Sequence, residues 1–435
     1  MVSVKKCCFP NLGCILLLIS INFLNFIDRG YLASVNINVI SDFNLTNTQS
    51  GIISSSFLVG YLLFSPIFSW AVYRFNRIYL IIIGLFVWVG CVLACSFCYS
   101  YLPLVLCRLG VGVGEAAFSS IGPPIIDTYS PQSSSSRWLS FYYLAIPVGY
   151  ALGFLYGGLL IDLGYIWQIG YLIESICMFL FALLLLFYRN IDKQQAVVEL
   201  EENLLSDKKN YVSLREKLSI MFCDGQYIAN LIVYVFYIFV IGSYSYWGPI
   251  YVIDKFHINE TSSDYIFGGV TIVTGVVGTF LGGIILDKLR QRFDRVFIAY
   301  IINLICLVLG GIFCEIAFAV QNLYAFVTLL VFGAFFLFAL TGPINSVFIW
   351  LVEKDNKYTK NVNNQLKSLS CSMMILFSHL LGDVPSPILT GYIQDTINNW
   401  SITMMLLTTI LLFSIIVAIY LVVIKRRQVH EFNLL

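Results

Sequence analysis

Long apolar stretches alternate with short polar segments along nearly the whole of this 435-residue chain. The apolar stretches lie at residues 12–38, 49–73, 77–98, 100–129, 138–162, 164–188, 226–252, 264–289, 296–318, 322–352, 363–393 and 400–424. Each is long enough for a helix that crosses a bilayer, which needs about 20 residues. The runs are too long and unbroken for the strands of a membrane barrel, which have about ten residues. The pattern therefore predicts an all-α membrane protein with twelve transmembrane helices.

The composition agrees with this prediction and excludes several classes of protein. Apolar residues make up 59% of the chain and charged residues only 11%, whereas soluble domains carry about 25% charged residues. The 25 basic and 24 acidic residues nearly cancel, so the chain lacks the basic face that binds nucleic acid. The sequence has no ATP-binding loop, nucleophile elbow or metal-ligand spacing. We therefore expect no enzyme, no cofactor and no metal site.

The basic residues predict the orientation in the membrane. With a cytoplasmic N-terminus, all 25 fall on the cytoplasmic side except Lys255 and two within spans, Arg29 and Arg108. Cytoplasmic loops retain basic residues during insertion, so both termini are predicted to be cytoplasmic. The three glycosylation sequons then fall on the opposite side, at Asn44, Asn259 and Asn399.

The longest polar stretch, residues 189–218, separates six spans from six. We predict an N-terminal six-helix bundle at 1–190, a cytoplasmic loop with a possible amphipathic helix at 191–222, and a C-terminal bundle with a short tail at 223–435. Transporters that rock two bundles around a central site have this organisation. An ordinary cytosolic loop is the alternative interpretation.

Asp28, Arg108 and Glu115 are the clearest ionisable residues inside the apolar spans of the first half. An ionisable group at mid-membrane costs about 2.5–3.5 kcal/mol on insertion scales, so these groups must face partners or water. Asn22, Asn25 and Asp28 recur every three residues and line one face of the first span. We expect Asp28, Arg108 and Glu115 to project together into a water-reachable hollow, where proton binding competes with ion pairing. A static ion-pair network is the alternative.

The eleventh span contains a second polar group, His379 and Asp383, followed by Pro385 and Pro387. Residues four apart are neighbours on a helix, and the prolines predict a bend that lines a cavity. A histidine and an aspartate at this spacing also occur in acyltransferases, but so short a match is common by chance. A hydrogen-bonded structural pair is the other alternative.

Glycines and aromatic residues suggest further roles. Pro147, Gly149 and the glycines that follow in the fifth span, and the glycine-rich eighth span, predict close and sliding helix contacts. Tyr237 and its aromatic neighbours in the seventh span could border a pocket for an acyl chain. Residues 244–247 are interpreted as an interfacial aromatic belt. Glu174 and Glu315 are interpreted as structural.

Four segments resemble the Spinster family, a branch of the major facilitator superfamily. They are residues 25–29 (NFIDR), 108–119 (RLGVGVGEAAFS), 141–149 (FYYLAIPVG) and 379–387 (HLLGDVPSP). The resemblance implies two six-helix bundles and proton-linked export of lysophospholipids or sphingoid lipids. It also implies that Asp28 and Glu115 are proton-sensitive carboxylates, with Arg108 as their partner and as a contact for the headgroup.

The resemblance also identifies gating segments. In the superfamily's loop between spans 2 and 3, Ser69 and Tyr73 replace the usual glycine and aspartate, whereas Arg74 and Arg77 remain. Closure on the cytoplasmic side is therefore expected to be weaker or differently controlled. The counterpart between spans 8 and 9 keeps Gly283 and Asp287.

The sequence thus predicts a monomeric secondary transporter that moves a lysophospholipid or a sphingolipid such as sphingosine-1-phosphate by proton-coupled alternating access. The expected partners are the lipid substrate, protons and membrane lipids. The predicted substrate-binding residues are Asn22, Asn25, Arg108, Ser119, Tyr237, His379 and Asp383. A carrier for small organic anions or sugars and a non-transporting lipid sensor are the alternatives. The location is lysosomal, endosomal or the plasma membrane, and residues 431–435 (EFNLL) resemble a dileucine sorting signal that is one residue short.

Overall fold

The computed structural model describes residues 12–72, 74–130, 135–189, 213–353 and 360–432. Every regular element in these ranges is a helix. Twelve helices in this part of the chain are long and apolar enough to cross a membrane. The predictions of an all-α membrane protein and of twelve spans are therefore confirmed. Tyr73 and the last three residues of the tail lie outside the described residues.

The chain forms two compact units. The first unit consists of Met1–Val35 and Ser56–Glu199, and the second of Asn36–Ser55 and Leu200–Leu435. The helices of the first unit are α1 (Leu12–Ser34), the later part of α3 (Asn47–Ala71), α4 (Arg77–Cys95), α5 (Tyr101–Tyr129), α6 (Ser135–Asp162) and α7 (Trp167–Leu186).

The second unit contains the short helix α2 and the beginning of α3 besides the later helices. Besides the beginning of α3, its helices are, in chain order, α2 (Asn36–Phe43), α9 (Leu214–Phe222), α10 (Gly225–Phe256), α11 (Glu260–Leu289), α12 (Arg295–Ala319), α13 (Leu323–Ala339), α14 (Thr341–Val352), α15 (Lys360–Ser378), η1 (His379–Asp383), α16 (Pro385–Ile397), α17 (Trp400–Thr409) and α18 (Leu411–Phe432). Helix α3 therefore begins in one unit and ends in the other.

Polar side chains begin many of these helices. Asn76, Asp224, Asp294 and Asn322 each accept a hydrogen bond from a backbone N–H group in the first turn of the helix that follows. Such caps satisfy donors that the helix itself leaves unpaired. Short polar segments of the sequence therefore fix where the spans start.

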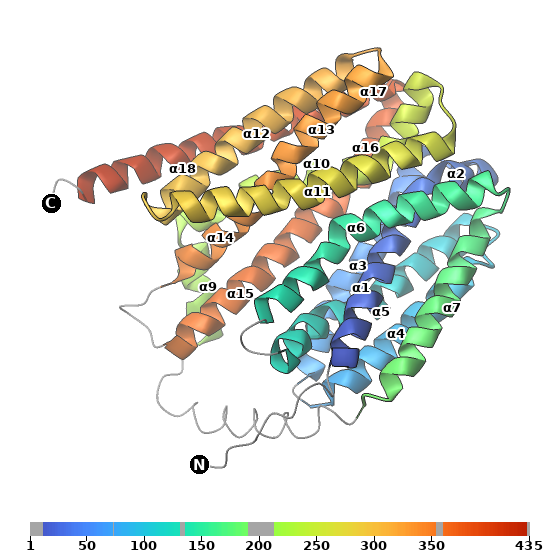
Figure 1. Cartoon of the computed structure of the whole chain (residues 1–435), viewed down its shortest axis with the longest axis horizontal. Coiled ribbons are helices and arrows are strands. Elements are labelled where there is room, and N and C mark those ends of the chain that lie inside the picture. The colour runs from blue at the N-terminus through green and yellow to red at the C-terminus, as the bar shows by residue number, and fades with distance from the viewer. Residues whose placement is uncertain (1–11, 73, 131–134, 190–212, 354–359, 433–435) are drawn as a thin grey trace. The chain divides into compact units, whose positions relative to one another are not determined.

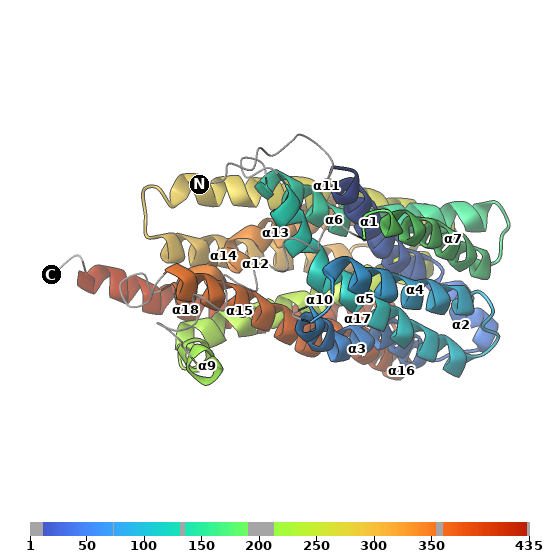
Figure 2. The ribbon, with the colours of Figure 1, turned by 90° about the horizontal axis from the view of Figure 1, so that it is seen from below.

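In the first unit, α1 packs along α6, and α4 packs along α5 (Figures 1 and 2). Glycines permit the first contact: a Cβ atom added to Gly149 would lie 2.5 Å from Cβ of Phe26, and one added to Gly153 would lie 2.4 Å from the carbonyl oxygen of Ile27. Gly30 of α1 faces the backbone of Tyr150 in the same way. The predicted close approach at the glycine-rich fifth span is confirmed, whereas sliding stays a prediction.

The aromatic residues near the end of α10 are buried, so the interfacial belt predicted for residues 244–247 is wrong. Trp247 is fully buried, and its indole N–H donates a 3.0 Å hydrogen bond to the carbonyl oxygen of Pro387. The hydroxyl of Tyr246 donates to the carbonyl oxygen of Ser50 at 2.9 Å. A buried tyrosine or tryptophan needs a partner for its polar atom, and α3 and α16 supply these partners.

Two long spans contain irregular turns. The tenth span consists of α13 and α14, which meet at Leu340, and the eleventh contains η1, a π-helical turn. At η1 the N–H group of Val384 donates to the carbonyl oxygen of His379, five residues earlier, at 2.9 Å. Pro385 and Pro387 have no N–H group, so the regular ladder cannot continue through them. The prolines thus change the backbone where the sequence predicted a bend.

Candidate functional site

A fully buried ion pair joins α1 to α5 in the first unit. Nη1 of Arg108 donates to both carboxylate oxygens of Asp28, at 2.8 and 2.9 Å. Arg108 is 0% exposed and Asp28 1% exposed. The rings of Phe57 and Tyr171 each lie 5.8 Å from the guanidinium carbon of Arg108. The pair is therefore shielded from solvent, and its charges interact strongly because little water screens them.

A second ion pair joins the same two helices. Arg29 of α1 pairs with Glu115 of α5, and its guanidinium carbon lies 4.5 Å from the ring centre of Phe57 and 4.8 Å from that of Phe26. The hydroxyl of Ser119 donates to Glu115 at 3.5 Å. The side chain of Arg29 is 12% exposed, whereas that of Glu115 is 3% exposed. This second pair is the more accessible of the two.

The predicted partnership of Arg108 with both carboxylates is wrong for Glu115, whose ion-pair partner is Arg29. The expectation that Asp28, Arg108 and Glu115 share one water-reachable hollow also fails, because the Asp28–Arg108 pair is fully buried. Consecutive helical residues point about 100° apart, so Asp28 and Arg29 reach different parts of α5. Arg29 lies inside the first span but was not among the predicted site residues. Its position beside Asp28 was the signal for a second pair.

The two asparagines of α1 contribute to packing in this structure. The side-chain amide of Asn22 donates to the carbonyl oxygen of Tyr142 on α6 at 2.8 Å, and Asn22 is 2% exposed. Asn25 is equally buried, and its amide nitrogen has no hydrogen-bond partner among the described residues. Both side chains lie in the interior of the first unit. Because they are buried, their exposure does not support the predicted contact with substrate.

The second unit holds a separate polar group. Nδ1 of His379 lies 2.6 Å from a carboxylate oxygen of Asp383, and their side chains are 23% and 20% exposed. Tyr237 of α10 is buried, and its hydroxyl lies 3.4 Å from that of Thr341 on α14. Asp383 interacts electrostatically with Tyr237. The pairing of His379 with Asp383 is as the sequence indicated, and Tyr237 belongs to the same neighbourhood.

The predicted gating residues differ in their surroundings. Arg74 is exposed and lies over the ring of Trp70. Its guanidinium carbon is 4.4 Å from the centre of that ring. Arg77, the first residue of α4, is buried. Asp287 forms an exposed 3.0 Å ion pair with Arg290. Pro147 lies inside α6, two residues before Gly149 and its contact with α1.

Gly283 is not the glycine of the close contact in α11. A Cβ atom added to Gly283 would meet nothing within 4 Å, whereas one added to its neighbour Gly282 would lie 1.9 Å from the carbonyl oxygen of Ala339. The motif identified the right segment, but the helix turns Gly282 toward α13. The close contact therefore involves a glycine that the sequence analysis did not single out as a gating residue.

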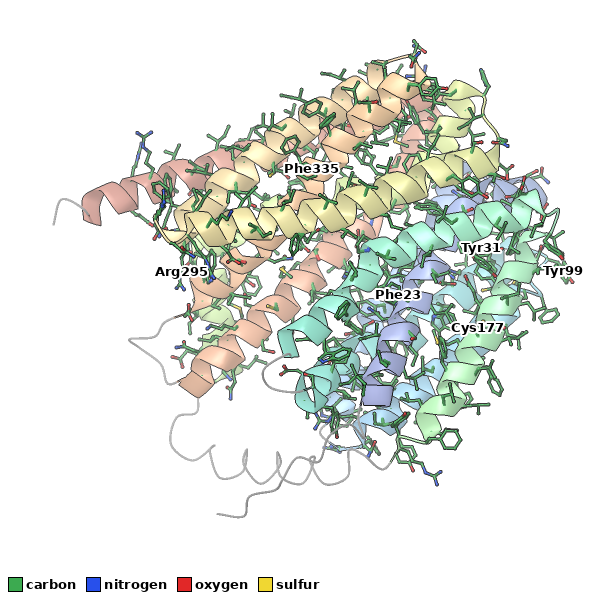
Figure 3. The ribbon with its side chains drawn as sticks, in the orientation of Figure 1. Phe23, Tyr31, Tyr99, Cys177, Arg295 and Phe335 are labelled. Carbon is green, nitrogen blue, oxygen red and sulfur yellow. The ribbon has the colours of Figure 1, made fainter. Side chains whose placement is uncertain are left out.

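Charges also cluster where α12, α14 and α15 meet. Glu353 accepts from Arg295 at 2.9 Å and from Lys367 at 2.5 Å. These bonds, Lys367 first, hold the pKa of Glu353 below its usual value, although partial burial opposes them. Figure 3 labels Arg295 at the start of α12. Among the described residues, no group of three or more histidine, cysteine, aspartate or glutamate side chains could hold a metal ion.

Comparisons with known proteins assign the family. The model of the Major Facilitator Superfamily matches residues 18–359. An Arabidopsis thaliana protein named probable sphingolipid transporter spinster homolog 2 is 34% identical over 90% of this chain and 82% of its own length. The chain belongs to the spinster family of the major facilitator superfamily. The family recognised from the four sequence segments is therefore confirmed.

More distant relatives of this spinster-family chain agree. Human protein spinster homolog 1 is 29% identical over 87% of this chain and 72% of its own length. A bacterial homolog to the human lysosomal transporter Spinster, solved in an inward-facing and unoccupied conformation, matches with a TM-score of 0.77 at 19% identity, covering 95% of this chain and 96% of its own. At that identity the structural likeness shows the fold alone. The chain is a spinster-type transporter and a multi-pass membrane protein.

Proposed function

We propose that this transporter moves a single-chain lipid with an anionic headgroup, a lysophospholipid or a sphingolipid such as sphingosine-1-phosphate, by proton-coupled alternating access. The Arabidopsis relatives, named probable sphingolipid transporters, support the lipid class. The observation that carries the proposal is the Arg29–Glu115 pair inside membrane-spanning helices, in which the arginine side chain is partly exposed. Ionisable residues at such depth are costly and are usually retained for function.

The chemistry of this pair suggests how a proton and an anion could be exchanged. Protonation of Glu115 removes its negative charge, so its ion pair with Arg29 is lost and the guanidinium can pair with a phosphate or carboxylate instead. When the proton leaves, Glu115 competes with the anion for Arg29. Binding of the headgroup therefore rises with protonation of Glu115, and its release follows deprotonation. The hydroxyl of Ser119 donates to Glu115, so Ser119 is close to the group that gains and loses the proton.

In the second unit, the partly exposed His379–Asp383 pair is our candidate for a further headgroup contact. It lies on a π-helical turn, an irregularity often found at functional sites. The neighbouring Tyr237 and Thr341 hydroxyls could position a polar group. Arg108, Asn22 and Asn25 have less support as substrate contacts, because each is almost fully buried.

Alternating access in this proposal rocks the bundles 1–190 and 223–435, joined by residues 191–222. The first residues of α3 belong to the second unit and its later residues to the first. We further propose that the protein acts as a monomer with both termini cytoplasmic, in the lysosomal, endosomal or plasma membrane.

Transport in vesicles tests the proposal. Purified protein in vesicles would be given labelled sphingosine-1-phosphate, a labelled lysophospholipid, a sugar or an organic acid, with and without an imposed pH gradient. Lipid flux that responds to the gradient in the wild type, and that loses this response in Glu115→Gln, is expected. The matched control is Glu315→Gln, which removes a half-buried glutamate of α12 in the second unit.

Other outcomes favour the alternatives. Flux of the sugar or organic acid without lipid flux would show that the substrate is a small polar solute and not a lipid. Saturable lipid binding without any flux would indicate a sensor. Lipid flux that ignores the gradient in the wild type would remove proton coupling from the proposal.

A further inference from the structure

Glu174 of α7 is a buried acid for which the proposed mechanism has no use. It is 2% exposed, and neither carboxyl oxygen accepts a hydrogen bond from an N–H or O–H donor among the described residues. Nε and Nη2 of Arg108 are likewise buried and have no acceptor among these residues. The interior of the first unit therefore contains a carboxyl group without a donor and a guanidinium group with two N–H donor atoms that have no acceptor among the described residues.

The surroundings of Glu174 contain one positive charge and one other carboxyl group. Glu174 lies one helical turn after Tyr171 on α7, and the ring centre of Tyr171 is 5.8 Å from the guanidinium carbon of Arg108. Arg108 of α5 and Asp28 of α1 are therefore neighbours of Glu174, and the Asp28 carboxyl is within hydrogen-bonding reach. Other titratable groups near Glu174 or its partners on the packed helices are Tyr31 of α1, Cys95 of α4, Tyr156 of α6, and Tyr171 and Cys177 of α7. Figure 3 labels Tyr31 on α1 and Cys177 on α7.

The balance of charge among Asp28, Arg108 and Glu174 favours one proton on the two carboxyl groups. Arg108 and an ionised Asp28 already neutralise each other, so an ionised Glu174 would leave a net negative charge in a site without solvent. Burying such an uncompensated charge is far more costly than burying a neutral acid. Moreover, two carboxyl groups can hydrogen-bond to each other only when one of them carries a proton. One proton shared by the two carboxyl groups would therefore balance the charge of Arg108.

We propose that Glu174 is the proton-holding partner of Asp28 and the alternative ion-pair partner of Arg108. In one state Glu174 is protonated and donates to Asp28, which pairs with Arg108. In the other, the O–H bond on Glu174 breaks and one forms on Asp28, so the negative charge moves to Glu174 and Arg108 follows it. The total charge is the same in both states. The link to transport rests on the proposed proton coupling, whereas the sharing of Arg108 does not.

Unfolding experiments test the sharing of Arg108 without any transport measurement. In Asp28→Asn, Glu174 can ionise and balance Arg108, so the melting temperature should fall only slightly. In Glu174→Gln, the amide can donate to Asp28, and the loss should again be small. In the double variant Arg108 has no carboxylate, so the loss should clearly exceed the sum of the single losses. Additive losses would overturn the inference.

Infrared spectroscopy and transport give two further readouts. The wild type should show the carbonyl band of a protonated buried carboxyl, which both single variants lose; a band that persists in Glu174→Gln would overturn the assignment. In vesicles, Glu174→Gln should transport without responding to a pH gradient, whereas Glu174→Asp and the control Glu315→Gln should keep the response. An unchanged response in Glu174→Gln would refute a role in coupling. A wild type without any response would refute proton coupling itself, while the unfolding result decides the sharing of Arg108 separately.

Discussion

Asp28 and Arg29 are adjacent in the sequence and enter different ion pairs. Asp28 points into the interior toward Arg108, whereas Arg29 pairs with Glu115 and is itself partly exposed. The first pair has a large desolvation cost, which its short hydrogen bonds offset as long as Arg108 keeps a carboxylate partner. The same helix α1 thus carries one fully buried pair and one pair with a partly exposed arginine.

Removing the charge of Arg108 should therefore destabilise the protein strongly. Arg108→Gln strands Asp28 in a buried site, and breaking a buried pair in this way costs about 3–5 kcal/mol. The control Arg74→Gln removes an exposed arginine that stacks on Trp70, and its effect should be within about 1 kcal/mol. Denaturant unfolding in detergent measures both. Equal losses for the two variants would contradict the structural role of the Asp28–Arg108 pair.

At the scale of elements, the glycines of α6 decide how closely it approaches α1. Gly153→Ala places a Cβ atom 2.4 Å from the carbonyl oxygen of Ile27, so the helices must separate or shift. Overpacking of this kind costs about 1–3 kcal/mol. Gly269→Ala in α11 meets nothing within 4 Å and should stabilise slightly, because alanine favours helices. Melting temperatures of the two variants should therefore shift in opposite directions, and a common direction would count against the contact.

Asp395 of α16 caps the beginning of α3. Its carboxylate accepts from the backbone N–H groups of Asn47 and Thr48 at 2.9 and 2.8 Å, and from both side chains. Loss of a cap costs about 0.5–2 kcal/mol. Asp395→Ala should therefore speed hydrogen exchange of the amides in the first turn of α3. Asp254→Ala, which removes an exposed carboxylate near the end of α10, should leave that exchange unchanged.

The cluster around Glu353 should respond to acid. Its pKa is lowered in the folded protein by Lys367 and Arg295. The bonds therefore stabilise the junction of α12, α14 and α15 fully above the pKa of an unfolded glutamate, about 4.3. They are lost as the pH falls through the lower folded value. Glu353→Gln should reduce stability at neutral pH and flatten its decline below pH of about 4. An identical acid profile in wild type and variant would refute this linkage.

At the scale of the whole molecule, the orientation rests on the distribution of basic residues. Cys223 is an exposed cysteine directly after α9, on a segment predicted to be cytoplasmic. A membrane-impermeant maleimide should label it in permeabilised cells but not in intact cells, if the protein is placed in the plasma membrane. The control Cys223→Ser should lose that increment of labelling. Labelling of Cys223 in intact cells would reverse the predicted topology.

The sequence by itself determined the twelve spans, the helical class and the family. Apolar runs must match the thickness of the bilayer, and motifs such as residues 108–119 are specific strings; neither depends on how helices pack. It also selected Asp28, Arg108 and Glu115, because charges stand out in apolar spans. The contact between His379 and Asp383 could be predicted because residues four apart on a helix are neighbours.

Only the tertiary structure decided which charges pair and which polar residues are buried. Pairing depends on the rotation of α1 against α5, which periodicity leaves open, and so Arg29 rather than Arg108 meets Glu115. The burial of Trp247 and the proximity of Glu174 to Asp28 depend on helices that are distant in sequence. Hydropathy places a residue along the membrane normal, whereas its neighbours around the helix are set by packing.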